Sequence, residues 1–224
     1  MTQRTGANWT VTRVRSDQAP TPFLQQDRLG DTESFGADTA SVGPVKPEWA
    51  NEELRTARLA LRHPVASDLE AVLRIHQTPE AVAHNPSDAI EDQAGAGRLL
   101  QRWIDQWRRQ AVGYWAVSWR GDPSVLGFCG IKVMSLHDRP VANLFYRFDP
   151  CVWGRGVASE AASVVVDWAL ARSPGLPVIA RVRPDNVASA RVAIKAGLNR
   201  AEALDTLGED GLDQIFVSPG WQQI

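Results

Sequence analysis

The spacing of hydrophobic residues along the chain predicts its helices and strands. Apolar side chains at steps of three and four share one face of a helix, whereas alternating ones share one face of a strand. The helical spacing occurs at 67–77, 89–110, 157–172 and 187–195. Alternating or short apolar runs predict strands at 58–62, 114–119, 125–134, 143–149 and 177–183, and a closing hairpin at 198–205 and 213–218. The three consecutive strands between 114 and 149 favour an antiparallel meander.

The first 53 residues lack this regularity. They contain several prolines and glycines and no sustained period, so we predict a mostly irregular N-terminal tail at 1–53 and one domain at 54–224. Within the tail, the segment 8–14 carries Trp9, Val11 and Val14. We expect it to form either a short strand docked on the domain or part of a solvated extension.

Composition and charge narrow the class of protein. The content of 44% hydrophobic and 22% charged residues is ordinary for a globular domain, and a formal net charge of −2 gives no reason to expect a nucleic-acid surface. No run of about 18 apolar residues could span a membrane, and no apolar run typical of a secretion signal follows Met1. Cys129 and Cys151 are both assigned to strands, without the spacing of a metal site or a disulfide framework. We therefore expect a cytoplasmic protein without a bound metal.

A turn with two near-adjacent glycines follows an expected strand and precedes an expected helix. Gly154 and Gly156 let the backbone bend sharply and allow a bulky anion to approach the N–H groups. The unpaired N–H groups of the first helical turn and the helix dipole then favour a phosphate at this position. The sequence therefore predicts a phosphate-binding turn.

Two common phosphate motifs do not fit this turn. The segment 154–159 nearly matches the dinucleotide fingerprint, but it follows a meander, and the next strand ends in arginine rather than in an acidic ribose ligand. A nucleotide P-loop requires Gly-Lys followed by Ser or Thr, which the turn lacks.

Four motifs together resemble the GNAT superfamily of acyl-CoA-dependent N-acyltransferases, in particular its RimJ/RimL-like branch. They occur in the family's order at 54–62, 126–131, 153–161 and 183–198, and the resemblance covers about 160 residues. The resemblance implies a mixed α/β (α+β) fold with helices on both faces of a central, mostly antiparallel sheet, which splays to form a CoA groove. It also implies acetyl-CoA as the co-substrate. One departure is Trp153, where the superfamily often has Gln or Arg.

The resemblance also implies which residues bind the cofactor. Backbone N–H groups of the glycine turn hold the CoA pyrophosphate, and the strand at 145–148 diverges from 178–182 so that its edge pairs with pantetheine amides. Asn186 contacts the pantetheine arm, although an N-cap of the following helix also suits an Asn, and both can hold at once. The expected cofactor-binding residues are Phe148, Trp153, Gly154, Arg155, Gly156, Val157, Ala158, Ser159 and Asn186. The side chain of Arg155 is expected either to contact phosphate or to be solvated.

The catalytic residues are less well defined by the motifs. Many superfamily members have a Tyr seven residues after the Asn, but this chain has Ala193 there. Ser189 and Tyr146 are the candidates for assisting the departing thiolate. Candidates for the base that deprotonates the amine are Glu80, His137, Asp138 and Asp149, while Glu160 is expected to be structural. A covalent acyl-cysteine intermediate is not expected, because a buried strand Cys is ordinarily inert.

The resemblance thus predicts an N-acetyltransferase that transfers an acetyl group from acetyl-CoA to a primary amine by direct attack in a ternary complex. The acceptor is expected to be a small-molecule amine or a protein N-terminus. An aminoglycoside, a polyamine and the amine of an aminoacylated tRNA are the specific alternatives, and the near-neutral charge of the chain disfavours the last. The alternative is a non-catalytic acyl-CoA-binding module, suggested by Ala193. The sequence is compatible with a homodimer and does not require one.

Overall fold

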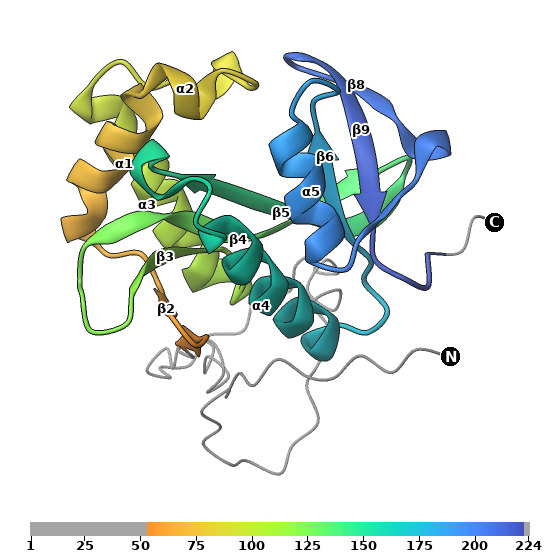
Figure 1. The fold of residues 1–224 in the computed structure, drawn as a ribbon, viewed down its shortest axis with the longest axis horizontal. Helices are drawn as coiled ribbons and strands as arrows, with labels where there is room; N and C mark the ends of the chain where they lie inside the picture. The colour runs from red at the N-terminus through yellow and green to blue at the C-terminus, as the bar shows by residue number, and fades with distance from the viewer. Residues whose placement is uncertain (1–52, 222–224) are drawn as a thin grey trace, which may run out of the picture.

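The computed structural model describes residues 53–221 of the chain. The expectations for residues 1–52, including the strand at 8–14, lie outside this range. None of the helices within 53–221 is long and apolar enough to cross a bilayer. In Figure 1, α1–α3 lie on the left and β6, β8, β9 and α5 on the right, with β5 and α4 between them.

One mixed sheet organises the described domain. Its order is β1-β2-β3-β4-β5-β6-β9-β7, and β8 pairs only with β9. Every neighbouring pair is antiparallel except β5 and β6, which confirms the mostly antiparallel sheet. The strands are β1 (Leu54–Arg55), β2 (Leu59–Arg62), β3 (Tyr114–Trp119), β4 (Val125–Leu136), β5 (Arg139–Phe148), β6 (Val178–Val182), β7 (Asn199–Arg200), β8 (Thr206–Gly208) and β9 (Gly211–Val217).

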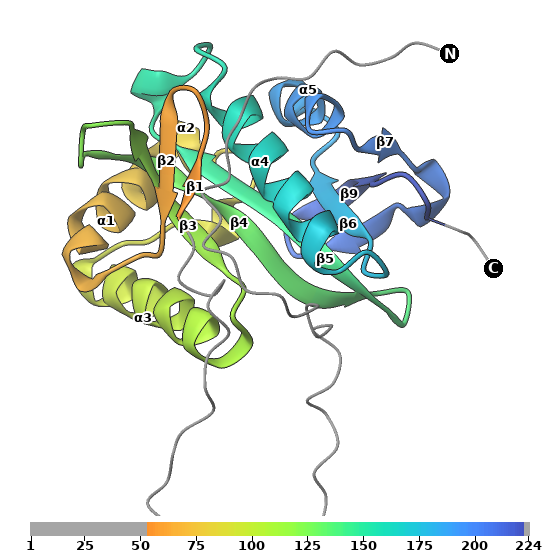
Figure 2. The ribbon, with the colours of Figure 1, turned by 90° about the horizontal axis from the view of Figure 1, so that it is seen from below.

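Helices cover both faces of this sheet. The helices are α1 (Leu69–Gln77), α2 (Pro79–Val82), α3 (Gln93–Gln110), α4 (Val157–Arg172) and α5 (Val187–Lys195). On one face, α1 and α3 bury a cluster that includes Trp103 against Phe128 of β4. On the other face, α4 packs its valines and Trp168 against Trp115 and Ile131. Figure 2 shows the strands between α3 and α4. The two cores therefore hold the sheet as a rigid middle layer.

Most predicted elements are confirmed, since β3, α4 and α5 have the expected bounds. The meander differs in the length of its second turn, because β4 extends to Leu136 and β5 begins at Arg139 rather than at 143. Only His137 and Asp138 connect the two strands, and both adopt positive φ, of 47° and 59°. Such a pair matches the twist of a tight hairpin. The prediction of a longer turn was wrong.

Two other predictions were also wrong. The segment 198–205 is not one strand, because β7 ends at Arg200 and a 3₁₀ turn (Glu202–Leu204) follows it. Asp205 supplies the reason: its carboxylate accepts the backbone N–H of Ile215 at 3.0 Å, so a side chain takes the place of a strand partner. Cys151 is not in a strand either; it lies exposed in the 3₁₀ turn Pro150–Val152 that follows β5.

Candidate active site

The sheet opens between β5 and β6. Their parallel pairing covers only three residue pairs, from Ala142 with Val178 to Leu144 with Ala180. Beyond this point β4 continues to pair with β5 as far as Phe148, while β9 continues to pair with β6 as far as Val182. The expected divergence of 145–148 from β6 is therefore confirmed, and one edge of β5 keeps backbone groups free to pair with an extended ligand.

The glycine turn lies at the end of this free edge. After β5, Asp149 accepts the N–H of Cys151 at 2.9 Å and starts the 3₁₀ turn, and the chain then bends through Gly154 and Gly156 into α4. Both glycines have positive φ, of 72° and 76°, which other residues adopt only with strain. Gly156 precedes α4 directly and has no side chain to cap the helix. The first N–H groups of α4 can therefore bind an anion.

Contacts from the first strands brace the turn. Glu160 accepts hydrogen bonds from the hydroxyl of Thr56 and from the backbone N–H and guanidinium of Arg58. Arg58 also donates to the carbonyl oxygen of Arg155 at 3.0 Å. Burial alone would raise the pKa of Glu160, but these hydrogen bonds outweigh it and leave the pKa below its ordinary value. The Glu160 carboxylate thus ties the β1–β2 turn to α4, which agrees with the expected structural function.

The side chains of Arg155 and Trp153 are exposed at the turn. The guanidinium of Arg155 lies 5.1 Å from the ring centre of Trp119, so this side chain is held by a cation–π contact. Trp153 is half exposed, and its indole N–H donates to the carbonyl oxygen of Phe148 at 2.9 Å. The phenyl ring of Phe148 is buried. Phe148 therefore presents backbone rather than side chain to the groove.

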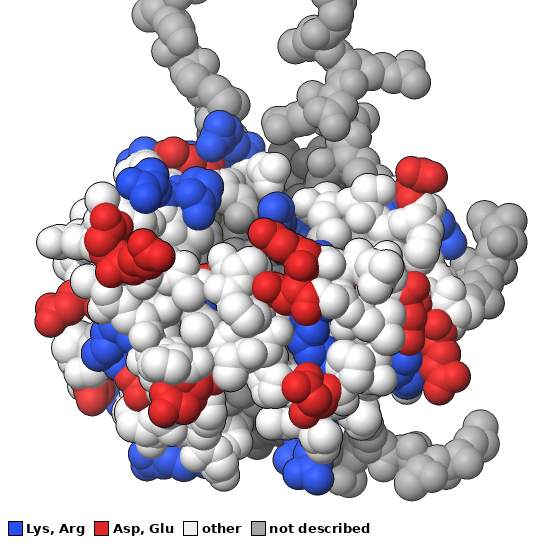
Figure 3. Space-filling view, turned by 90° about the horizontal axis from the view of Figure 1, so that it is seen from above, with Lys and Arg blue, Asp and Glu red and all other residues white. Residues whose placement is uncertain are grey.

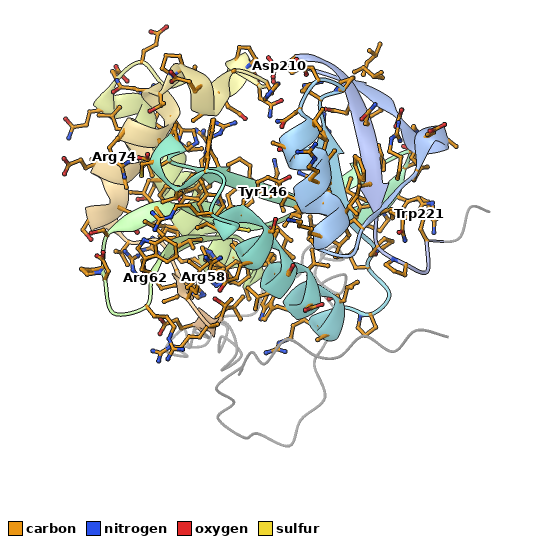
Figure 4. All side chains as sticks on the ribbon, viewed as in Figure 1. Arg58, Arg62, Arg74, Tyr146, Asp210 and Trp221 are labelled. Carbon is orange, nitrogen blue, oxygen red and sulfur yellow. The ribbon has the colours of Figure 1, made fainter. Side chains whose placement is uncertain are left out.

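Three of the predicted site residues meet where β5 faces α5. Asn186 accepts the N–H of Ser189 at 3.0 Å, which confirms it as the N-cap of α5 and leaves its amide donors available. Tyr146 donates its hydroxyl to the carbonyl oxygen of Ser189 at 3.0 Å. Burial raises the pKa of Tyr146, so its phenol stays protonated at neutral pH. Figure 4 shows Tyr146 in the middle of the molecule, between β5 and α5.

A cavity of about 670 Å³ extends from these residues through the opening of the sheet. Its lining includes Tyr146, Asn186 and Ser189 and continues along α3, β4, β5 and β6 to the loops at 85–88 and 209–213. Ser87 donates its N–H and hydroxyl to Asp210 at 3.1 and 2.7 Å, joining the two loops above the cavity. These hydrogen bonds and nearby Arg183 lower the pKa of Asp210. Figure 3, seen from this side, shows basic and acidic side chains interspersed along the middle of the face.

The wall opposite Tyr146 contains polar residues that sequence reasoning missed. Arg147 is buried and pairs with Asp88 at 2.7 Å. His76 is also buried and hydrogen-bonds the carbonyl oxygen of Val72 through Nδ1 at 2.9 Å; burial and the charge of Arg147 lower its pKa to about 4. Asn143 completes this wall. The sequence signal for Asn143 and Arg147 was their spacing of four, which places two polar side chains on one face of a largely apolar strand.

The predicted bases lie away from this cavity. Glu80 is exposed in the first turn of α2, and His137 lies in the β4–β5 turn with Nε2 3.2 Å from the carbonyl oxygen of Leu204. Asp149 forms an ion pair with Arg74, which Figure 4 labels on α1. None of these residues, nor Asp138, is among those that line the cavity. Cys129 is fully buried, and burial raises the pKa of its thiol, so it is no nucleophile.

The described residues contain no group of three or more His, Cys, Asp or Glu side chains that could hold a metal ion. The carboxylates that line the cavity are Asp88, Glu209, Asp210 and Asp213.

Comparisons with known proteins agree with this geometry. The family described as acetyltransferase (GNAT) domain matches residues 58–199. The uncharacterized protein YkkB of Bacillus subtilis is 29% identical over 111 residues, which span 48% of this chain and 64% of YkkB. The uncharacterized N-acetyltransferase YoaA of the same organism is 26% identical over 67% of this chain and 85% of its own length. Among solved structures, RimL, a ribosomal L7/L12 alpha-N-protein acetyltransferase in complex with coenzyme A, superposes with a TM-score of 0.61 at 16% identity, covering 74% of this chain and 97% of RimL.

Proposed function

Because the chain belongs to the GNAT acetyltransferase family, we propose that it transfers the acetyl group of acetyl-CoA to a primary amine by direct attack in a ternary complex. One observation carries this proposal: the free edge of β5 leads directly to the glycine turn at the start of α4. A ligand with a pyrophosphate at one end and an amide-bearing arm at the other fits that order of groups.

In this proposal the backbone of the turn binds the pyrophosphate. The N–H groups from Arg155 to Ser159 supply the donors, and the positive φ of Gly154 and Gly156 allows the close approach. Trp153 and the backbone of Phe148 border the groove, and the free amide donors of Asn186 contact the pantetheine arm.

Transfer to an amine requires two proton movements. The ammonium must lose a proton before attack, and the departing thiolate must be stabilised or protonated. The phenol of Tyr146 can serve the second purpose because it stays protonated, and the hydroxyl of Ser189 is the alternative. Glu80 stays the candidate base from the sequence; it does not line the cavity, so it would have to act through bridging water.

The acceptor is proposed to be a small-molecule amine or a protein N-terminus. RimL acts on the α-amine of a ribosomal protein, and a likeness at 16% identity extends to the fold. The cavity of about 670 Å³ is lined from Ser189 of α5 to Arg102 of α3, and this extent is compatible with either acceptor. The cytoplasmic location and the homodimer stay predictions from the sequence.

Two assays on the full chain test the proposal. Calorimetry measures the dissociation constant of acetyl-CoA, and a thiol reagent follows CoA release with a panel of amines. Tyr146→Phe is expected to leave acetyl-CoA affinity unchanged and to lower kcat by about 100-fold, the scale of lost general acid catalysis. Ser163→Ala is the control, because Ser163 donates to the Ser159 carbonyl within α4 and does not line the cavity.

The outcomes separate the alternatives. Acetyl-CoA binding without amine-dependent thiol release would favour the non-catalytic acyl-CoA-binding module suggested by Ala193. A chain that does not bind CoA at all would refute the proposed function. Equal loss of kcat in Tyr146→Phe and Ser163→Ala would remove Tyr146 from the mechanism.

A further inference from the structure

Strand β5 presents different residues to its two faces. Tyr146 reaches α5 on one face. Phe145 packs on the other face, with its ring 4.7 Å from that of Tyr114 and 6.2 Å from that of Trp103. Since side chains alternate along a strand, Asn143 and Arg147 share the face of Phe145. These three residues line the cavity on the side away from the glycine turn and α5.

Arg147 has a hydrogen-bonding capacity that the protein does not use. Its side chain is only 5% exposed, and one terminal nitrogen donates to Asp88 at 2.7 Å. Nη1 is buried and has no hydrogen-bond partner among the described residues. A buried, unpaired donor on a charged group is costly, so its presence beside a cavity points to a ligand that completes it. Asn143 Oδ1 on the same face is buried and unpaired as well.

The remaining charges of the cavity favour a negative ligand on this side. Arg181 and Arg183 are already paired with acidic residues of the β8–β9 hairpin. Arg102 and Arg109 lie on one face of α3, at a helical spacing of seven, and Lys132 lies on β4; all three line the cavity. These three cations have no acidic partner in the described part of the chain. The α3 side of the cavity therefore has a positive field. On the opposite wall the arginines are neutralised by their acidic partners.

We propose that the acceptor amine carries an anionic group, a carboxylate or a phosphate, that binds Arg147 in the field of Arg102 and Lys132. This inference rests on the proposed acetyl transfer, because only that reaction makes the bound anion part of an acceptor. The planar guanidinium can bind Asp88 through one nitrogen and the anion through the other. Direct binding of the anion to a buried guanidinium selects acceptors with an anionic group over amines of equal length that lack one.

A binding experiment tests the anion site without turnover. Acetate and inorganic phosphate are titrated into the full chain saturated with CoA, so that the glycine turn is occupied, and binding is followed by calorimetry. The double variant Arg147→Gln with Asp88→Asn removes both charges of the pair and avoids leaving one buried charge alone. It is expected to weaken anion binding about tenfold or more, the scale of one charge-assisted hydrogen bond.

Two variants of α3 form a matched pair. Arg102→Gln removes an exposed charge that faces the cavity, whereas Arg108→Gln removes one that pairs with Asp105 and does not line it. Arg102→Gln is expected to weaken anion binding about threefold, as for a partly screened charge. Arg108→Gln is expected to leave it unchanged. Absence of anion binding to the CoA-saturated wild type, or equal losses in the two variants, would overturn the inference.

A second arm compares acceptors. β-Alanine is matched with β-alaninamide, 5-aminopentanoate with 5-aminopentanamide, and phosphoethanolamine reports on phosphate against carboxylate. The carboxylate member of each pair is expected to have the higher kcat/KM, by about tenfold, and the double variant is expected to abolish this preference. Equal or reversed preference refutes the anion site while acetyl transfer stands. If the chain binds acetyl-CoA but acetylates none of these amines, the binding arm decides the inference alone.

Discussion

The neutral imidazole of His76 is expected to control how the stability of the fold depends on pH. Its side chain is buried beneath α3, with Nδ1 bound to the carbonyl oxygen of Val72 and its ring 5.8 Å from that of Trp103. Protonation would place a second positive charge beside Arg147. For both reasons the pKa of His76 falls to about 4.

The sign and the size follow from this value. Between pH 6.5 and pH 4 the unfolded chain binds a proton at His76 and the folded chain does not, so the free energy of unfolding falls as the pH is lowered through this range. The difference between 6.5 and about 4 corresponds to about 3 kcal/mol at 1.36 kcal/mol per pKa unit. Glu160 and Asp210 have lowered pKa values, so their contributions are lost at lower pH, below their ordinary pKa.

Urea unfolding at a series of pH values from 4 to 7.5, followed by circular dichroism, measures this effect. His76→Gln keeps a donor for Val72 and removes the titrating group, so most of the loss between pH 6.5 and pH 4 is expected to disappear. His84→Gln is the control, because that imidazole is partly exposed and contacts Asp185. An unchanged pH profile in His76→Gln, or a His76 imidazole that titrates near pH 6.5 by NMR, would refute the reasoning.

Three other substitutions give clear expectations. Asn186→Asp keeps the cap oxygen for Ser189 and removes the amide donors, so it is expected to weaken acetyl-CoA binding in calorimetry with little change in stability. Asn186→Ala is expected to lower both affinity and stability. Equal acetyl-CoA affinities of Asn186→Asp and the wild type would refute the proposed pantetheine contact. Gly156→Ala is expected to lose most acetyl-CoA affinity, while Gly121→Ala, with a similar φ of 82° and open space around it, measures the cost of strain alone. Glu160→Gln is expected to lower the free energy of unfolding in urea by about 1 kcal/mol, allowing for the half-exposed Arg58, and no change would show that the brace is unimportant.

The glycine turn and the N-cap of α5, which form the proposed donor side, could be predicted from the sequence because local chemistry determines them. Gly154 and Gly156 are required by the backbone itself, and Asn186 caps the helix that it precedes. Both signals lie within a few residues of the structure that they specify. The bounds of α4 and α5 were predicted for the same reason, since periodicity is a local property.

The contacts of the proposed acceptor side could not be predicted in this way. Arg147 and Asp88 are 59 positions apart, and Ser87 and Asp210 are 123 apart, so the sequence alone gives no sign of either contact. The error at 198–205 has the same origin, because the Asp205 carboxylate replaces a strand partner for Ile215 only after the chain has folded. Tertiary hydrogen bonds of this kind override local strand propensity.

The two sides of the proposed reaction depend on the register of one strand. Tyr146 contacts α5, whereas Arg147 on the opposite face pairs with Asp88; because the two are neighbours on β5, a shift of one residue would exchange them. The pairing of β4 with β5 runs without interruption from Leu136 with Arg139 to Gly127 with Phe148, and the two-residue turn at its end fixes the starting pair. The positive φ values of His137 and Asp138 are what make so short a turn possible. The His137–Asp138 turn supplied two candidate bases in the sequence, but in the structure it fixes the register of β5 and so places Tyr146 and Arg147 on opposite faces.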